Sequence, residues 1–167
     1  MASMFNVGIA ELKTSRDPGD TLMALGLGSC VAVSVYDSAA RVGGVLHFML
    51  PCAKEHESRG SPLKFADTAV PMLLEELERL GGARGNMVAR LAGGASMFPN
   101  PGGGAGSAGS SGDVGRRNVA ADHASLAQCG VRVAGEETGG HRGRTLKLEI
   151  GTGRTFVRSI GEPEKEI

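Results

Sequence analysis

The chain has very few aromatic residues and no surplus of charge. Its 167 residues include no tryptophan, one tyrosine and five phenylalanines, so a core must be built from Val, Leu, Ile, Ala and Met. Lys plus Arg and Asp plus Glu number 18 each, which gives a formal net charge of zero. Without a broad basic field to attract phosphates, we expect no nucleic-acid partner and no binding to anionic lipid.

Long apolar runs and an N-terminal targeting pattern are also missing. The longest apolar runs have the length of strands and fall short of the roughly 20 residues that a membrane-spanning helix needs. The N-terminus has no basic region followed by an apolar one. We therefore expect a cytoplasmic protein with no direct membrane insertion. Its length suits a single domain, residues 1–167, that buries roughly 70% of its unfolded surface.

Cysteine is sparse, and its spacing does not suggest a metal site. The cysteines Cys30, Cys52 and Cys129 are odd in number and provide no disulfide framework. The sequence has neither a Cys-x-x-Cys pair nor a closely spaced pair among its four histidines, His47, His56, His123 and His141. Since zinc sites use such pairs, we expect reduced thiols and no metal.

Hydrophobic periodicity predicts an α+β domain. Helical spacing occurs at 64–80 and 114–129, and each stretch is followed by glycine. Strand patterns occur at 5–12, 31–36, 42–49, 87–92, 131–134, 145–150 and 154–160. Turns or loops are predicted at 14–20 and 136–140, a surface loop rich in Gly and Ser at about 99–113, and a frayed tail at 162–167. We expect mainly antiparallel or mixed strands covered by two principal helices.

A glycine-rich run, Leu25–Cys30, leads into the predicted hairpin of 31–36 and 42–49. In an antiparallel pair of strands, the residue numbers of two directly opposed residues always add up to the same value. A turn centred near Ala39 therefore puts Cys30 opposite His47 or its near neighbours. Directly opposed Cβ atoms lie roughly 4.5–5.5 Å apart, so a thiol and an imidazole can meet there. This arithmetic permits a thiol nucleophile with its base.

Less specific interpretations of the same residues remain open. Free cysteine is often simply a small buried apolar residue, and His47 equally fits a core histidine with satisfied hydrogen bonds. The glycines near Cys30 do not complete a nucleotide-binding Gly-x-Gly-x-x-Gly pattern, because Val31 occupies the third position. Backbone N–H groups near Gly28 and Ser29 are better suited to stabilising an oxyanion beside a thiol.

Six motifs resemble one known family in the same order along nearly the whole chain. They are Leu25–Val33, His47–Pro51, Lys64–Val70, Ala92–Phe98, Arg117–Asn118 and Glu137–Gly140. Together they resemble the chemoreceptor glutamine deamidase family, CheD. The resemblance implies a hydrolase of bacterial or archaeal chemotaxis, a protein-glutamine glutaminase acting on methyl-accepting chemotaxis proteins. It also implies that Cys30 is the nucleophile, that His47 is the base, and that no cofactor takes part.

One position departs from the family pattern. The family usually has threonine directly before Leu-Gly-Leu-Gly-Ser-Cys, as a third catalytic residue, whereas this chain has Ala24. Thr21 lies three residues earlier, so on an extended strand it faces the other way. Two hypotheses follow: an active deamidase, and a CheD-like binding module that regulates a CheC-type phosphatase of CheY-phosphate, a partner that the resemblance implies.

Overall fold

The computed structural model describes residues 2–55, 60–97 and 114–167. The Gly- and Ser-rich loop predicted at 99–113 lies outside these residues. The described strands are β1 Ser3–Asn6, β2 Glu11–Ser15, β3 Asp20–Leu27, β4 Val31–Asp37, β5 Val42–Phe48, β6 Met87–Gly93, β7 Arg132–Thr138, β8 Arg144–Glu149, β9 Thr155–Ser159 and β10 Lys165–Glu166. The helices are α1 Ala66–Arg79 and α2 Val114–Gln128, with short 3-10 turns η1 Ala53–Glu55, η2 Pro62–Lys64 and η3 Arg84–Asn86.

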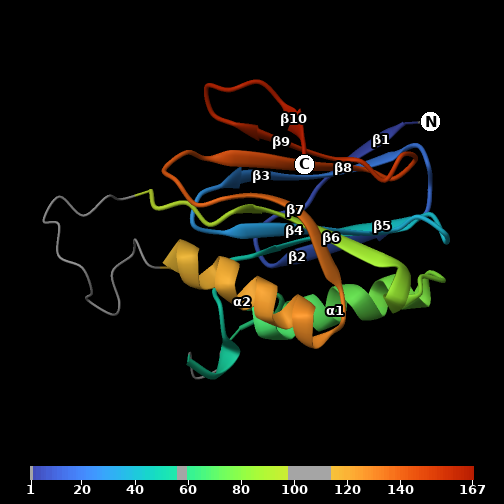
Figure 1. Ribbon diagram of the computed structural model, residues 1–167, viewed down its shortest axis with the longest axis horizontal. Helices are drawn as coiled ribbons and strands as arrows, with labels where there is room; N and C mark the ends of the chain where they lie inside the picture. The colour runs from blue at the N-terminus through green and yellow to red at the C-terminus, as the bar shows by residue number, and fades with distance from the viewer. Residues whose placement is uncertain (1, 56–59, 98–113) are drawn as a thin grey trace, which may run out of the picture.

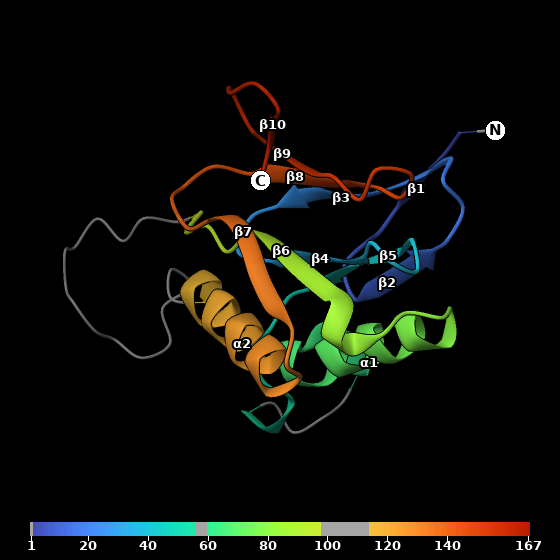
Figure 2. The ribbon, with the colours of Figure 1, turned by 45° about the vertical axis from the view of Figure 1, so that its right-hand side comes forward.

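These elements form three layers (Figure 1). The outer sheet has the strand order β1-β3-β8-β9-β10, and the central sheet has the order β2-β5-β4-β6-β7. Both helices lie against the face of the central sheet that points away from the outer sheet (Figures 1 and 2). The predicted α+β class with mixed strands and two principal helices is confirmed. The helices cover one sheet, and the outer sheet covers that sheet's other face.

The central sheet is buried on both faces, which explains why its middle strands are almost continuously apolar. Every residue of β4 and β5 is buried. Alternate side chains such as Val33 and Leu46 pack toward the helices, whereas Ala32 and Val45 pack toward the outer sheet. Each large apolar side chain buried in this way contributes roughly 1.5–3 kcal/mol. The strands that carry the site are therefore enclosed by apolar cores on both faces.

Three local predictions were wrong. The segment 5–12 is not one strand, because Ala10 has φ 59° and the Glu11 side chain accepts a hydrogen bond from Gly8 N–H (2.8 Å). The chain turns there and crosses from the outer sheet to the central sheet. Residues 136–138 extend β7, and the tail forms β10 with Lys165 paired to Val157.

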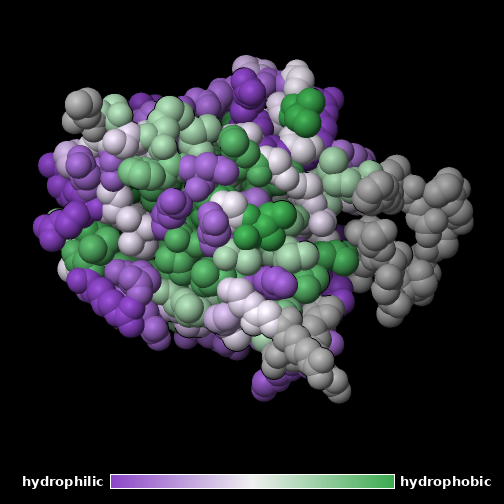
Figure 3. Space-filling view, turned by 180° about the vertical axis from the view of Figure 1, so that it is seen from behind, coloured by the Kyte–Doolittle hydropathy of each residue, from purple (hydrophilic) through white to green (hydrophobic). Residues whose placement is uncertain are grey.

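The opposite side of the molecule has a mixed surface. Apolar residues gather across the middle of this face, with polar residues around them (Figure 3). Several large apolar side chains are exposed on the molecule as a whole, among them Met4, Ile9 and Leu25. No helix in the described residues is long and apolar enough to cross a membrane.

Candidate functional site

The segment between β3 and β4 carries Gly28, Ser29 and Cys30, and its three carbonyl groups are all held by hydrogen bonds. Gly28 O accepts from Ala95 N–H at 2.9 Å, and Cys30 O accepts from Gly94 N–H at 2.9 Å. Ser29 O accepts from the side-chain Nδ2 of Asn118, also at 2.9 Å. With its carbonyls fixed on the scaffold side, this segment presents Cys30 in a defined position at the start of β4.

His47 lies near the end of β5 and is 2% exposed. Its direct partner across the β4–β5 ladder is Ala32, two residues beyond Cys30. Ala32 and Val45 both belong to the core between the sheets, so His47 points to that side as well, and Cys30 packs against the same core. The structure therefore brings Cys30 and His47 to one face of the central sheet, offset diagonally rather than directly opposed.

The hydrogen bonds of His47 assign its tautomer. Nδ1 lies 3.0 Å from Val7 O, and since a carbonyl only accepts, Nδ1 carries the proton. Nε2 then has a free lone pair. This atom is buried and has no hydrogen-bond partner among the described residues, the thiol of Cys30 included. An unprotonated Nε2 is the form that a general base requires.

Burial keeps both reactive groups neutral at rest. Burial raises the pKa of the Cys30 thiol above its ordinary value of 9.0. The backbone N–H of Cys30 itself lowers this pKa, but offsets the rise only in part. Burial lowers the pKa of His47 below 6.5, against the opposing influence of the Val7 hydrogen bond and of the Glu11 charge. The resting pair is therefore thiol and imidazole, not thiolate and imidazolium.

Gly28 and Ser29, the residues predicted to support an oxyanion, directly precede Cys30 in the segment between β3 and β4. The Cys30 N–H acts to lower the pKa of the thiol on the same residue, although burial outweighs this effect. Among the described residues, no backbone carbonyl accepts a hydrogen bond from the N–H of Ser29 or Cys30. Gly28 packs closely under Met97, whose Cγ would lie 3.0 Å from a Cβ at that position. A larger residue at Gly28 would push Met97 away.

The remaining cysteines and histidines have other surroundings. The Cys52 thiol donates to Asp67 at 3.2 Å, and Cys129 packs against the core beneath the helices. His123 contacts Glu136, and His141 Nδ1 lies 2.9 Å from Ser96 O. His56 lies outside the described residues. No group of three or more His, Cys, Asp or Glu side chains that could hold a metal occurs in the described part of the chain.

Ala24, at the family's threonine position, is fully buried in the core between the two sheets. It pairs with Leu146 on β8. Leu22 and Ala24 point into this core, whereas Thr21, out of phase with both, lies on the other face of β3. Thr21 therefore does not supply the missing hydroxyl.

Asn118 is the site residue whose position sequence reasoning missed. The sequence places it only within the Arg117–Asn118 motif of the family resemblance. Its side chain is fully buried, and it contacts the backbone on both sides of the site. The sequence does contain a signal: the polar residues Asn118, Asp122 and Ser125 recur at helical spacing, and they lie on the buried face of α2 together with Gly115 and Leu126.

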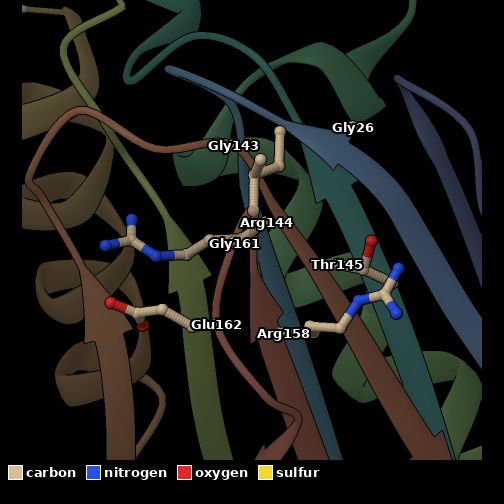
Figure 4. Close-up of a pocket in the computed structure, with 8 residues that line it drawn as sticks. Gly26, Gly143, Arg144, Thr145, Arg158, Gly161 and Glu162 are labelled. Atoms are coloured by element: carbon tan, nitrogen blue, oxygen red, sulfur yellow. The ribbon is translucent and has the colours of Figure 1, made fainter.

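A cavity of about 300 Å³ lies near the start of the Cys30 segment. Gly26 at the end of β3 lines it, and its charged side chains are Arg144 from β8, Arg158 from β9 and Glu162 from the segment after β9 (Figure 4). Neither Cys30 nor His47 lines this cavity. It is therefore a neighbour of the site and does not contain the thiol.

The fold and the site define a class of protein: a two-sheet α+β domain with a cysteine and a histidine on one interior face. The sequence model of the CheD family, described as CheD chemotactic sensory transduction, matches residues 49–159. The chain belongs to the CheD family.

Two curated relatives carry the name "Probable chemoreceptor glutamine deamidase CheD". The Desulforamulus reducens protein is 42% identical over 96% of this chain and 93% of its own length. The Clostridium kluyveri protein is 40% identical over 96% of both chains. The crystal structure of a Neisseria meningitidis protein of the DUF152 family is similar in fold, with a TM-score of 0.53 and 12% identity over 83% of this chain and 64% of that one.

Proposed function

We propose that this protein is a chemoreceptor glutamine deamidase, which hydrolyses glutamine side-chain amides of methyl-accepting chemotaxis proteins to glutamate and ammonia. Family membership and the names of relatives at 42% and 40% identity support the activity and the substrate class. One structural observation carries the mechanism: His47 directs its protonated Nδ1 to Val7, which leaves Nε2 as a base on the face that also carries Cys30.

In the first half of the reaction, the Cys30 S–H proton moves to His47 Nε2, and sulfur forms a bond to the carboxamide carbon of glutamine. The carbonyl oxygen becomes an oxyanion, for which the backbone N–H groups of Ser29 and Cys30 are the donors. The carbon–nitrogen bond then breaks as His47 returns its proton to the departing nitrogen. Ammonia leaves, and a thioester to Cys30 remains.

In the second half, water gives a proton to His47 and its oxygen attacks the thioester carbon. The carbon–sulfur bond breaks, and sulfur recovers a proton from His47. The receptor now carries a glutamate in place of a glutamine. Because both Cys30 and His47 are neutral at rest, the proton transfer between them belongs to the substrate complex rather than to the free enzyme.

The direct test incubates the purified protein with receptor fragments and measures ammonia release, together with the mass change of each glutamine. Cys30→Ala and His47→Ala are expected to abolish both signals. Cys52→Ala, which removes a half-buried thiol outside the site, is the control and keeps activity. If Cys30→Ala and His47→Ala both released ammonia at the wild-type rate, the proposed dyad would be wrong.

A second candidate function rests on Ala24. Without a hydroxyl at this buried position, the chain is suited to a role as a binding module for a CheC-type phosphatase of CheY-phosphate. Under this alternative, the wild-type protein leaves receptor glutamines unchanged where a threonine-bearing relative converts them. It also changes the phosphatase rate of the CheC-type partner. Measuring both activities on the same preparation separates the two functions.

A further inference from the structure

The side chain of Asn118 joins two segments that are far apart in sequence. Its Nδ2 donates one hydrogen bond to Ser29 O and one to Met49 O, each at 2.9 Å. Ser29 immediately precedes Cys30, and Met49 follows His47 by two residues. Asn118 lies on α2, which packs on the central sheet (Figure 2). A single amide group therefore contacts the thiol segment and the end of the histidine strand at the same time.

The bond to Ser29 differs from those at the neighbouring residues. Gly28 O and Cys30 O accept from backbone N–H groups, which almost any sequence can supply. Ser29 O depends on one side chain, and both hydrogens of that amide are used. The reversed orientation would place Oδ1 against two carbonyl oxygens and is unfavourable. The contacts therefore define the amide's orientation.

We propose that Asn118 is a positioning residue, which ties the Cys30 segment to the end of β5 and so sets the spacing between the Cys30 thiol and the His47 imidazole. The role in catalysis rests on the proposed deamidase function. The Asn118 amide touches no reacting atom, and it acts only through the backbone of Ser29 and Met49.

A purely structural role explains less of what is observed. Asn118 is fully buried, and its Oδ1 has no hydrogen-bond partner among the described residues. A buried amide with an unpaired oxygen lowers stability relative to an apolar residue that fills the same space. Attaching α2 to the sheet would need only apolar contacts, such as those of Leu126. The two donated bonds are what an apolar residue cannot supply.

The experiment compares Asn118→Leu with Ser125→Ala, a control on the same buried face of α2 and seven residues further along the helix. Three quantities are measured: the thermal midpoint, the pH profile of iodoacetamide alkylation at Cys30 followed by peptide mass spectrometry, and kcat and KM for ammonia release. Mapping the Cys30 peptide separates its reaction from those of Cys52 and Cys129. If Asn118→Leu does not fold, Asn118→Ser, which keeps one short donor, replaces it.

If Asn118 is a positioning residue, Asn118→Leu should change kcat and Cys30 alkylation in ways that a loss of stability alone would not. Asn118→Leu should lower kcat by about 100-fold with KM within about threefold, as expected for a reactive group displaced by about 1 Å. Release of the segment should also expose the thiol, so Cys30 alkylation becomes faster and its pH midpoint falls toward that of a free thiol. Ser125→Ala should change neither quantity.

The proposal is overturned if Asn118→Leu lowers the thermal midpoint but leaves kcat and the Cys30 alkylation profile at wild-type values. The alkylation profile needs no deamidase activity. If wild-type protein released no ammonia, the proposed function would fail, while the shift in alkylation would still decide whether Asn118 holds the thiol segment in place.

Discussion

The backbone of Gly93 passes so close to Cys30 that a Cβ atom on Gly93 would lie 2.2 Å from the Cys30 carbonyl oxygen. Gly93 also has φ +114°, a conformation that residues with a Cβ rarely adopt. Gly93→Ala must therefore displace the Cys30 segment or β6. We expect this change to lower the free energy of unfolding by about 2 kcal/mol or more, measured by urea denaturation.

Gly85→Ala is the matched control for Gly93→Ala, because a Cβ on Gly85 meets open space. Its free energy of unfolding should stay within about 0.5 kcal/mol of wild type. Cys30 alkylation should change in the Gly93 variant and not in the Gly85 variant. Two variants of equal stability would contradict the close contact between Gly93 and Cys30.

The pH dependence of Cys30 alkylation tests the resting state of the thiol. Burial raises the Cys30 pKa, so the thiolate forms only above the pH at which an ordinary thiol ionises. We expect the rate constant of the Cys30 peptide to rise at a higher pH than that of an unfolded control peptide of the same sequence. A plateau of fast alkylation near neutral pH would instead indicate a preformed thiolate and imidazolium pair.

His47→Asn separates the hydrogen bond of His47 from its chemistry. The Asn side-chain N–H replaces Nδ1–H as the donor to Val7 O but provides no base. Ammonia release should be lost, while the thermal midpoint at mildly alkaline pH stays close to that of wild type. Wild-type rates in this variant would exclude His47 as the base.

His47→Asn should also change how the free energy of unfolding depends on pH below neutrality. Burial lowers the His47 pKa below 6.5, so below that pH the unfolded chain binds a proton that the folded chain does not. Wild-type stability is therefore lost as pH falls from 6.5 toward the folded pKa, and it is fully present above 6.5. His47→Asn should show a smaller loss over this range. Parallel curves for the two proteins would contradict the lowered pKa.

Local patterns were sufficient to predict the hairpin and the helices. The turn residues after Tyr36 constrain the strand register, and the observed pairing of Ala32 with His47 leaves Cys30 two residues from direct opposition. The helix expected at 64–80 is Ala66–Arg79, and that expected at 114–129 is Val114–Gln128. Both patterns depend on periodicity within one element, which a single sequence contains.

Contacts between segments that are distant in sequence could not be predicted from periodicity within a single element. β7 continues through Thr138 because it pairs in parallel with β6, with Glu137 opposite Ala92, and this pairing overrides the expected turn. The role of Asn118 depends on where Ser29 and Met49 meet α2. No short sequence pattern predicts this three-way contact, so the sequence could suggest Cys30 and His47 as site residues but not the side chain that connects their segments.

Ala24→Thr tests whether the family's missing hydroxyl limits activity. Ala24 is fully buried in the core that His47 also faces, where the unpartnered Nε2 lies. A new hydrogen bond to the base worth about 1 kcal/mol would increase the rate of ammonia release several-fold. The measurement is kcat with receptor fragments, compared with wild type.

Ala24→Val is the control for Ala24→Thr, since valine has nearly the same shape without the hydroxyl. It should not increase kcat. An equal increase in both variants would attribute the effect to packing, and no increase in the threonine variant would mean that this chain does not need the hydroxyl.

Asp122 on α2 carries the last prediction, which concerns stability. Its side chain is fully buried, and both oxygens lack hydrogen-bond partners among the described residues. Burial, and then the charge of Glu136, raise the Asp122 pKa well above 3.8. The folded chain therefore keeps a proton that the unfolded chain releases above 3.8, so stability declines as pH rises from 3.8 toward the folded pKa.

Asp122→Asn keeps the shape of the neutral side chain but has no carboxyl proton to release on unfolding. We expect the variant to be more stable than wild type at mildly alkaline pH, with a difference that narrows as pH falls toward 3.8. Urea denaturation across pH provides the measurement. Glu75→Gln, at an exposed carboxyl group on α1, is the control and should keep the free energy of unfolding within about 0.5 kcal/mol of wild type. If Asp122→Asn followed the wild-type curve across pH, the raised Asp122 pKa would be contradicted.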